Sequence, residues 1–252
     1  MKQEKKTWRS FYNTLDVIPR DNSVVCVGHD NPDPDTIFSN DVIREILHGM
    51  GFEKTSFLYS GEIIDPQNRN LVDMFDMNLQ RGTLDDLISY DYLIFADHNG
   101  GHCDLYKEAN RNNLISDENI LCVIDHHHGT PPSAYYTDIR TEVGAASTIV
   151  GEYLFNGGRK LLSKDKFYEC ATKLTIGINT DTQNLKKNAS NQDWRVHWLL
   201  QPYVDKNKIV SYEKQEWPMS WVRSFGKALE NMSIDEDKAL VSLGYADREK
   251  MS

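Results

Sequence analysis

The 252-residue sequence has little cysteine and no long apolar run. Its four cysteines, Cys26, Cys103, Cys122 and Cys170, include no C-x-x-C pair, so neither a disulfide framework nor a thiolate zinc site is indicated. No segment approaches the roughly 20 apolar residues of a membrane span. No apolar stretch follows the basic residues of the N-terminus, as a secretory signal would require. We therefore expect a cytoplasmic protein without a membrane partner.

The sequence also lacks an excess of positive charge. Its 28 Lys and Arg residues stand against 38 Asp and Glu residues, for a formal net charge of −10. Broad binding to duplex DNA needs a basic face, so we expect no duplex DNA partner. A small anionic substrate is not excluded, because acidic residues gathered around divalent cations are neutralised locally.

Strand and helix patterns alternate along the first 200 residues. Strands are predicted to start near residues 24, 55, 92 and 120, about one βαβ unit apart, with an edge strand at 135–139. Helical spacing of apolar residues covers parts of 1–22, 37–50, 68–77, 144–157 and 164–178. This alternation predicts an α/β fold, a parallel β-sheet with helices on both faces.

Three of the predicted strands end in acids or imidazoles. The run Ile120–Ile124 leads into Asp125, His126, His127 and His128, and Gly129 ends the strand. The strand at 24–27 is followed by His29, Asp33 and Asp35, and the strand at 92–96 by Asp97. The carboxyl ends of parallel strands meet at one edge of a sheet, where ligands bind. We expect these side chains to lie close together.

Each of these elements has a bland interpretation when taken alone. Adjacent histidines in a loop are more often solvated than ligating, the string from Asn31 to Asp35 is typical of a turn that caps a helix, and Asp97 is an ordinary acid at a strand end. Together, several carboxylates could not all ionise without cations. Oxygen and nitrogen ligands without sulfur favour Mn²⁺, with Mg²⁺, Co²⁺ or Zn²⁺ as alternatives. Four carboxylates would balance two divalent ions and leave a nearly neutral site.

Four motifs in order resemble those of the DHH phosphoesterase superfamily. They are His29-x-Asn31-Pro32-Asp33-x-Asp35, Asp97 after a strand, Asp125-His126-His127, and Gly177-Ile178-x-Thr180-Asp181-Thr182. The resemblance covers roughly residues 24–200. The superfamily includes hydrolases of short oligonucleotides and of phosphoadenosine phosphate, exopolyphosphatases and family II pyrophosphatases.

The resemblance implies a centre of two Mn²⁺ ions, with Mg²⁺ or Co²⁺ as alternatives. It assigns His29, Asp33 and Asp97 to one ion, and Asp35, Asp97, His126 and Asp181 to the other. The implied catalytic residues are His127, facing the scissile phosphate, and Asp125, orienting an imidazole. The expected substrate-binding residues are Asn31, Arg140 and Ser147. His98 and His128 beside the motifs are expected to be solvated or to support a ligand from behind.

The expected domains are a metal-dependent phosphoesterase domain at 1–202, a linker at 203–235 with one amphipathic helix, and the start of an incomplete C-terminal substrate-binding domain at 236–252. The expected function is Mn²⁺-dependent hydrolysis of phosphoester bonds in nucleotides or short single-stranded oligonucleotides by two metals. The alternatives are an inorganic pyrophosphatase or exopolyphosphatase, and a non-catalytic nucleotide- or metal-sensing module. Homodimer formation is left open.

Overall fold

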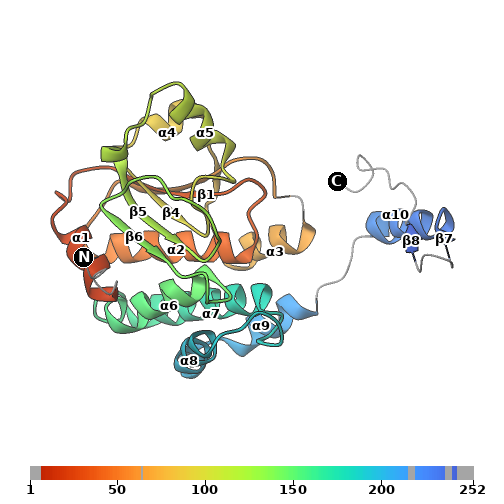
Figure 1. Ribbon diagram of the computed structural model, residues 1–252. Helices are drawn as coiled ribbons and strands as arrows, with labels where there is room; N and C mark the ends of the chain where they lie inside the picture. The colour runs from red at the N-terminus through yellow and green to blue at the C-terminus, as the bar shows by residue number, and fades with distance from the viewer. Residues whose placement is uncertain (1–6, 64, 215–218, 236–239, 243–252) are drawn as a thin grey trace.

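The computed structural model describes residues 7–63, 65–214, 219–235 and 240–242, and its centre is a six-stranded parallel sheet (Figure 1). The strand order is β3-β2-β1-β4-β5-β6, and every neighbouring pair is parallel. The strands are β1 Val24–Gly28, β2 Thr55–Tyr59, β3 Gln80–Arg81, β4 Tyr92–Ala96, β5 Ile120–Asp125 and β6 Tyr136–Ile139. The predicted α/β fold is confirmed, and the strand expected at 135–139 does form an edge.

Helices cover both faces of this sheet (Figure 1). On one side, α2 (Pro34–Gly49) packs against the strands, and α6 (Ala146–Asn156) and α7 (Lys164–Asp181) pack against α2. On the other side lie α4 (Leu84–Ile88) and α5 (Asp104–Arg111). Helices α1 (Trp8–Asp16), α3 (Pro66–Met74) and α8 (Asn191–Leu200) also belong to the main body.

Alternation along the strands divides the core into two parts. Cys26 and Ile94 face the larger core under α2, whereas the neighbouring Val25 and Val27 face the smaller core under α5. Because side chains point to opposite faces of a strand, a strand covered on both sides must be apolar at every position. This explains why β1 and β5 are continuous apolar runs that end abruptly at polar residues.

The chain after Leu200 contains more structure than the one helix expected between 203 and 235. Helix α9 (Lys206–Glu213) packs on α7 and α3, where the Lys208 ammonium donates to the Met74 carbonyl at 3.1 Å. Helix α10 (Met219–Glu230) carries the expected amphipathic pattern and lies apart from the main body in Figure 1. Strands β7 (Ser233–Asp235) and β8 (Leu240–Ser242) pair antiparallel. Most of the C-terminal unit expected at 236–252 lies outside the described residues.

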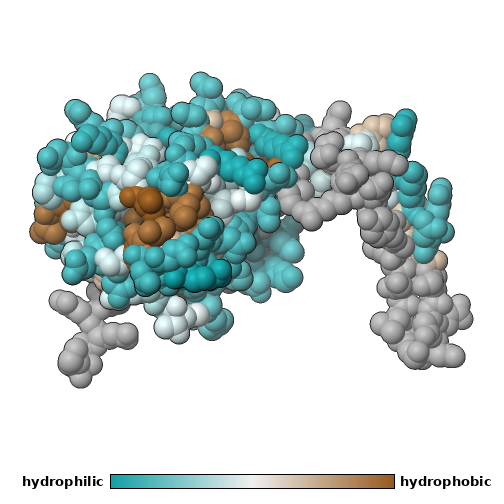
Figure 2. Space-filling model, turned by 90° about the horizontal axis from the view of Figure 1, so that it is seen from above, coloured by the Kyte–Doolittle hydropathy of each residue, from teal (hydrophilic) through white to brown (hydrophobic). Residues whose placement is uncertain are grey.

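The surface in view in Figure 2 is mainly hydrophilic, with apolar side chains gathered in a few patches. Exposed apolar residues of this kind are normal on a folded domain. None of the helices in the described part of the chain is long and apolar enough to cross a membrane.

Candidate metal centre

The polar side chains after three neighbouring strands converge at one edge of the sheet. His29 follows β1, Asp97 follows β4, and His126 and His127 follow β5. Their donor atoms, with those of Asp33, Asp35 and Asp181, form three overlapping groups, and the atoms within each group all lie within 4.8 Å of one another. Two of them are the groups expected to hold the two ions, His29, Asp33 and Asp97, and Asp35, Asp97, His126 and Asp181; the third is Asp97, His126 and His127. The structure thus brings together all six residues expected as metal ligands.

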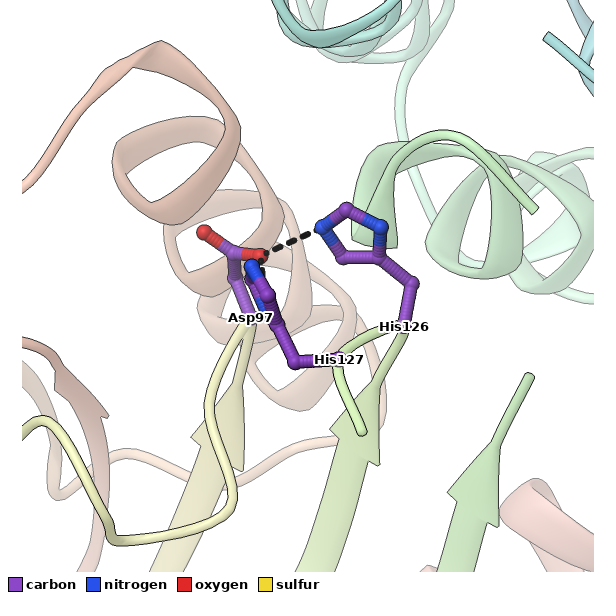
Figure 3. Close-up of side chains that lie close together, drawn as sticks. All are labelled: Asp97, His126 and His127. Atoms are coloured by element: carbon purple, nitrogen blue, oxygen red, sulfur yellow. Dashed lines mark ion pairs between the residues drawn. The ribbon is translucent and has the colours of Figure 1, made fainter. Parts of the chain in front are cut away.

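Asp97 belongs to all three of these groups, and Figure 3 shows its carboxylate beside the imidazoles of His126 and His127. Its backbone has a φ of 67°, which turns the side chain at the end of β4, and its amide donates to the Ile124 carbonyl at 2.9 Å. Oδ2 accepts a hydrogen bond from Thr36 Oγ1 at 2.5 Å and lies 3.5 Å from His29 Nε2. Oδ1 lies 3.2 Å from His126 Nε2. One carboxylate therefore faces imidazoles on both sides.

Two buried atoms at this position have no hydrogen-bond partner among the described residues. They are Asp97 Oδ1 and His126 Nε2, 3.2 Å apart. Buried polar atoms are nearly always satisfied, so each such exception needs an explanation. Two atoms with lone pairs that lie this close together in a geometry that makes no hydrogen bond fit two ligands of one cation. The donor set, oxygen and nitrogen without sulfur, therefore fits a hard or borderline divalent ion.

The two acids at the start of α2 are held by helix N-termini. Asp33 is the N-cap of α2, and its Oδ1 accepts the Thr36 amide at 3.0 Å, so the capping interpretation of this string is correct as well. Asp35 is buried, and its two oxygens accept the amides of Ala146 and Ser147, in the first turn of α6, at 2.6 and 2.7 Å. The positive end of the α6 dipole stabilises this carboxylate.

Asp125 fixes the orientation of His127 from behind. Its Oδ1 accepts the amides of His126 and His127 at 2.8 and 3.1 Å and lies 2.9 Å from His127 Nδ1. The His127 side chain is 47% exposed, and its Nε2 is left for a ligand. The hydrogen bond that His127 donates to Asp125 raises the pKa of His127. The arrangement presents an imidazole toward solvent beside the cluster.

The electrostatics of the cluster call for positive charge. Burial raises the pKa of Asp33 to about 6 and that of Asp35 well above its usual range, and Asp97 adds to both. Burial would also raise the pKa of Asp97, but the imidazoles of His126 and His29 lower it instead. Burial by itself would lower the pKa values of His29 and His126. The neighbouring carboxylates have the larger effect and raise the pKa to about 9 for His29 and to about 11 for His126. Without a cation, protons on the imidazoles supply the missing charge.

Two of the three side chains expected to bind substrate, those of Asn31 and Arg140, are engaged elsewhere in this structure. Asn31 Oδ1 accepts the amide of Glu62 at 3.4 Å. Arg140 forms ion pairs with two carboxylates, each at 2.7 Å. Ser147 is buried and supports Asp35 through its backbone amide. Their contact with a substrate stays a prediction.

Of two further neighbours of the cluster, Thr36 was not recognised from the sequence, and His98 was left with two alternatives. Thr36 binds Asp97, and its place in the first turn of α2 gave no signal of that contact. His98 is buried: its Nε2 lies 2.7 Å from the Val27 carbonyl, and its Nδ1 accepts the Gly100 amide at 3.1 Å. Burial lowers the pKa of His98 to about 4, so it is neutral, and the solvated alternative for it is wrong. His128, in contrast, is exposed.

Comparison with known proteins places this geometry in a family. An uncharacterized protein of Methanocaldococcus jannaschii is 28% identical over 217 residues, which are 86% of this chain and 42% of that protein. A probable manganese-dependent inorganic pyrophosphatase of Clostridium acetobutylicum is 28% identical over 137 residues, 54% of this chain and 41% of that protein. The chain therefore spans about two fifths of these curated relatives.

A solved structure shares the fold. The crystal structure of an exopolyphosphatase-related protein from Bacteroides fragilis superposes with a TM-score of 0.66 at 19% identity, covering 91% of this chain and 66% of that one. Residues 23–178, which include five of the six clustered ligand candidates, match the model of the DHH family, N-terminal domain. The chain belongs to the DHH family.

Proposed function

We propose that this chain is a hydrolase of phosphoester or phosphoanhydride bonds that works with two divalent cations, with Mn²⁺ as the first choice. The observation that carries the proposal is the position of Asp97. It belongs to every group of donor atoms at the site, and its buried Oδ1, beside His126 Nε2, has no hydrogen-bond partner among the described residues. The manganese dependence in the printed name of the C. acetobutylicum relative supports the choice of ion.

The six clustered residues divide between two cations. His29, Asp33 and Asp97 would hold one, and Asp35, Asp97, His126 and Asp181 the other. When bound, the cations supply Lewis-acid stabilisation of the phosphate and lower the pKa of an attacking water. Around them, Thr36 and the first turn of α6 keep the carboxylates in place. Such outer hydrogen bonds fix the direction of the ligand atoms.

His127 serves the substrate rather than a cation in this proposal. Its Nδ1 is taken by Asp125, and the Nε2 of this exposed side chain can donate to a phosphate oxygen. The hydrogen bond to Asp125 raises the pKa of His127 and so stabilises the protonated imidazole relative to a free one. A donor fixed in this way stabilises charge that develops on the phosphate in the transition state.

For the substrate, our first choice is a nucleotide or a short single-stranded oligonucleotide, without duplex DNA. The second candidate is pyrophosphate or polyphosphate, favoured by the printed names of the C. acetobutylicum and B. fragilis proteins. We further propose that residues 1–202 form the metal-binding domain and that 236–252 begin a second unit, with α9 docked on the first. A cytoplasmic location stays a prediction.

One panel of assays tests the function. The purified chain is loaded with Mn²⁺ and tested against pyrophosphate, polyphosphate, a dinucleotide, a nucleoside bisphosphate and a cyclic dinucleotide, with a variant lacking Asp97 as control. Release of nucleotides that depends on Asp97 supports a nucleotide or oligonucleotide substrate. Release of phosphate from pyrophosphate or polyphosphate alone supports the second candidate. Tight binding of Mn²⁺ without any turnover would instead favour a sensing module, and the hydrolase proposal would fail.

A further inference from the structure

A fully buried carboxylate in α8 lies outside the cluster of ligand candidates. It belongs to Asp193, in the first turn of that helix. Asp193 is neither among residues 23–178, which match the family model, nor in any of the four sequence motifs. A carboxylate taken out of water is stable only where hydrogen bonds replace its hydration. Its partners therefore show what this side chain holds in place.

Four hydrogen bonds converge on the Asp193 carboxylate. Ser190, the N-cap of α8, donates its amide and its hydroxyl to Oδ2, each at 2.7 Å, and the two residues form a capping box. The amide of Gly144 donates to the same oxygen at 2.9 Å, and the Thr148 hydroxyl donates to Oδ1. A helix cap needs only the contacts with Ser190. The contacts with Gly144 and Thr148 indicate a second role.

Residues 144–148 form the turn that binds Asp35, and Asp193 holds both ends of this turn. The two amides that donate to the Asp35 oxygens, at 2.6 and 2.7 Å, belong to Ala146 and Ser147. One partner of Asp193 precedes these amides and the other follows them. Two amides point at one carboxylate only while the backbone that carries them keeps its direction. Loss of Asp193 should therefore loosen the grip of the turn on Asp35.

The start of the same turn contacts His126. The Val143 carbonyl, one residue before Gly144, lies 3.4 Å from Nδ1 of this imidazole. When Nδ1 donates to the carbonyl, Nε2 carries the lone pair, as in most metal-binding histidines. Nε2 is the atom that lies 3.2 Å from Asp97 Oδ1 in the cluster. The position of the turn thus affects the direction of a second ligand atom.

A third contact joins the turn to the chain that follows Asp181. Gly144 packs so closely on this segment that a Cβ at position 144 would lie 2.6 Å from Thr182 Cγ2. Asp193 holds the contact from both sides, because it accepts hydrogen bonds from Gly144 and from Ser190, at the end of the loop that begins at Thr182. The end of α7, which carries Asp181, is therefore tied to the turn.

We propose that Asp193 is a positioning residue for one of the two cations. Its contacts lead to three of the four residues in one group of donor atoms, namely Asp35, His126 and Asp181. Asp33 of the other group is held instead by the amide of Thr36 in its own helix. This role rests on the proposed function in one respect, since the clustered donors are taken as cation ligands, and it requires no bond cleavage.

The test is stepwise Mn²⁺ binding by the full chain, measured by the electron paramagnetic resonance signal of free Mn²⁺. Asp193→Ala should weaken the binding of one ion by about 10–100-fold, the usual effect of losing a residue that orients a ligand, and leave the other unchanged. Asp193→Asn should restore most of this affinity. Its amide oxygen can still accept from Gly144 and Ser190, and its nitrogen can donate to the Thr148 hydroxyl.

Two further variants identify the affected ion. In an Asp33→Ala background, which leaves the group with Asp35 intact, Asp193→Ala should weaken the remaining ion. In an Asp181→Ala background, it should leave the remaining ion unchanged. Asp86→Ala is the matched control, because Asp86 forms the same kind of capping box with Thr83 in α4, on the opposite side of the sheet from α2. It should change neither affinity.

Equal weakening of both ions in Asp193→Ala would show a merely structural role, and no weakening of either would also overturn the proposal. If Asp193→Ala fails to fold, Thr148→Val is judged by the same criterion. This variant removes one of the four donors to Asp193 and leaves the cap of α8 in place.

If the wild type binds no Mn²⁺, the proposed function fails, and Asp193 is judged without metal. The amides of Ala146 and Ser147 should then exchange hydrogen roughly tenfold faster in Asp193→Ala than in the wild type, for the loss of a hydrogen bond to a charged group. Asp86→Ala should exchange these amides at the wild-type rate. Unchanged exchange in Asp193→Ala, measured by nuclear magnetic resonance in chelator, would refute the positioning role independently of any metal.

Discussion

Replacing Asp97 with glycine should remove metal from both groups of donors at once. Asp97 is the residue that the two groups share, with Oδ2 toward His29 and Oδ1 toward His126. Glycine is the informative substitution because the backbone at this position has a φ of 67°, which glycine adopts without strain and alanine does not. The variant therefore separates loss of the carboxylate from distortion of the strand end.

The expected magnitude follows from the contacts of this side chain. Loss of an outer hydrogen-bond partner alone typically costs about 10–100-fold in metal affinity. Asp97→Gly removes one oxygen from each of two sites, so we expect each affinity to fall by about 100-fold or more. Asp33→Ala removes an oxygen from one group only and should leave the other near full occupancy. Thr36→Val keeps the carboxylate but loses the 2.5 Å hydrogen bond, and should fall within the 10–100-fold range.

In the assay, metal-free protein is titrated with Mn²⁺, and binding is measured by calorimetry or by the electron paramagnetic resonance signal of free Mn²⁺. Far-ultraviolet circular dichroism of each variant in chelator checks that the fold is intact. The wild type should bind two ions, Asp33→Ala one with unchanged affinity, and Asp97→Gly neither at concentrations that fill the wild type. A folded Asp97→Gly that retains one ion at the wild-type affinity would refute the shared position of this carboxylate.

Three further results are expected. His127→Ala should keep its metal and lose roughly 100-fold or more in kcat, as for other transition-state donors, and metal loss in this variant would show that the imidazole is a ligand. Mn²⁺ affinity should rise as the pH is raised from 6 to 8, by about tenfold per pH unit for each proton that the ion displaces. The reason is that His29 and His126 have raised pKa values and must lose their protons before they can bind metal. An affinity that does not change with pH would contradict this. Asp41→Ala should lower the free energy of unfolding, measured in urea, by about 3 kcal/mol. The Asp41 carboxylate lies 2.7 Å from the buried Lys173 ammonium, and without it Lys173 keeps only the partly exposed carboxylate of Glu169 as a partner. The exposed control Asp16→Ala should cost under about 1 kcal/mol, and equal losses would refute the reasoning.

The sequence by itself indicated a parallel sheet with helices on both faces and the edge of the sheet where the site lies. Unbroken apolar runs are local signals, so β2 begins at Thr55 as predicted and β4 has the predicted bounds Tyr92–Ala96, whereas the strand order and the short β3 were not predicted. Once the strands were parallel, the geometry of a sheet required the residues after β1, β4 and β5 to meet. The convergence of the six ligand candidates was predictable for that reason.

Short polar helices were less predictable than the strands. Helix α5 has only a narrow apolar stripe, and α8 has three buried residues among ten. The spacing of apolar residues in these two segments was therefore too weak to distinguish a helix from a loop. Helix α9 has no fully buried residue, and its place on α3 and α7 depends on contacts such as that of Lys208 with Met74. Tertiary packing, rather than intrinsic helical preference, supplies most of the stability of such helices.

Only the tertiary structure decided which side chains support the site and which are occupied elsewhere. Asp35 is held by amides more than 100 positions away in α6, and Asp97 by a hydroxyl 61 positions earlier. The burial of His98 and the ion pair of Arg140 with Glu152 likewise depend on segments that meet only in the folded chain. Local sequence specifies which chemical groups a strand delivers to its end, but the partners of those groups come from other elements, and folding alone brings them together.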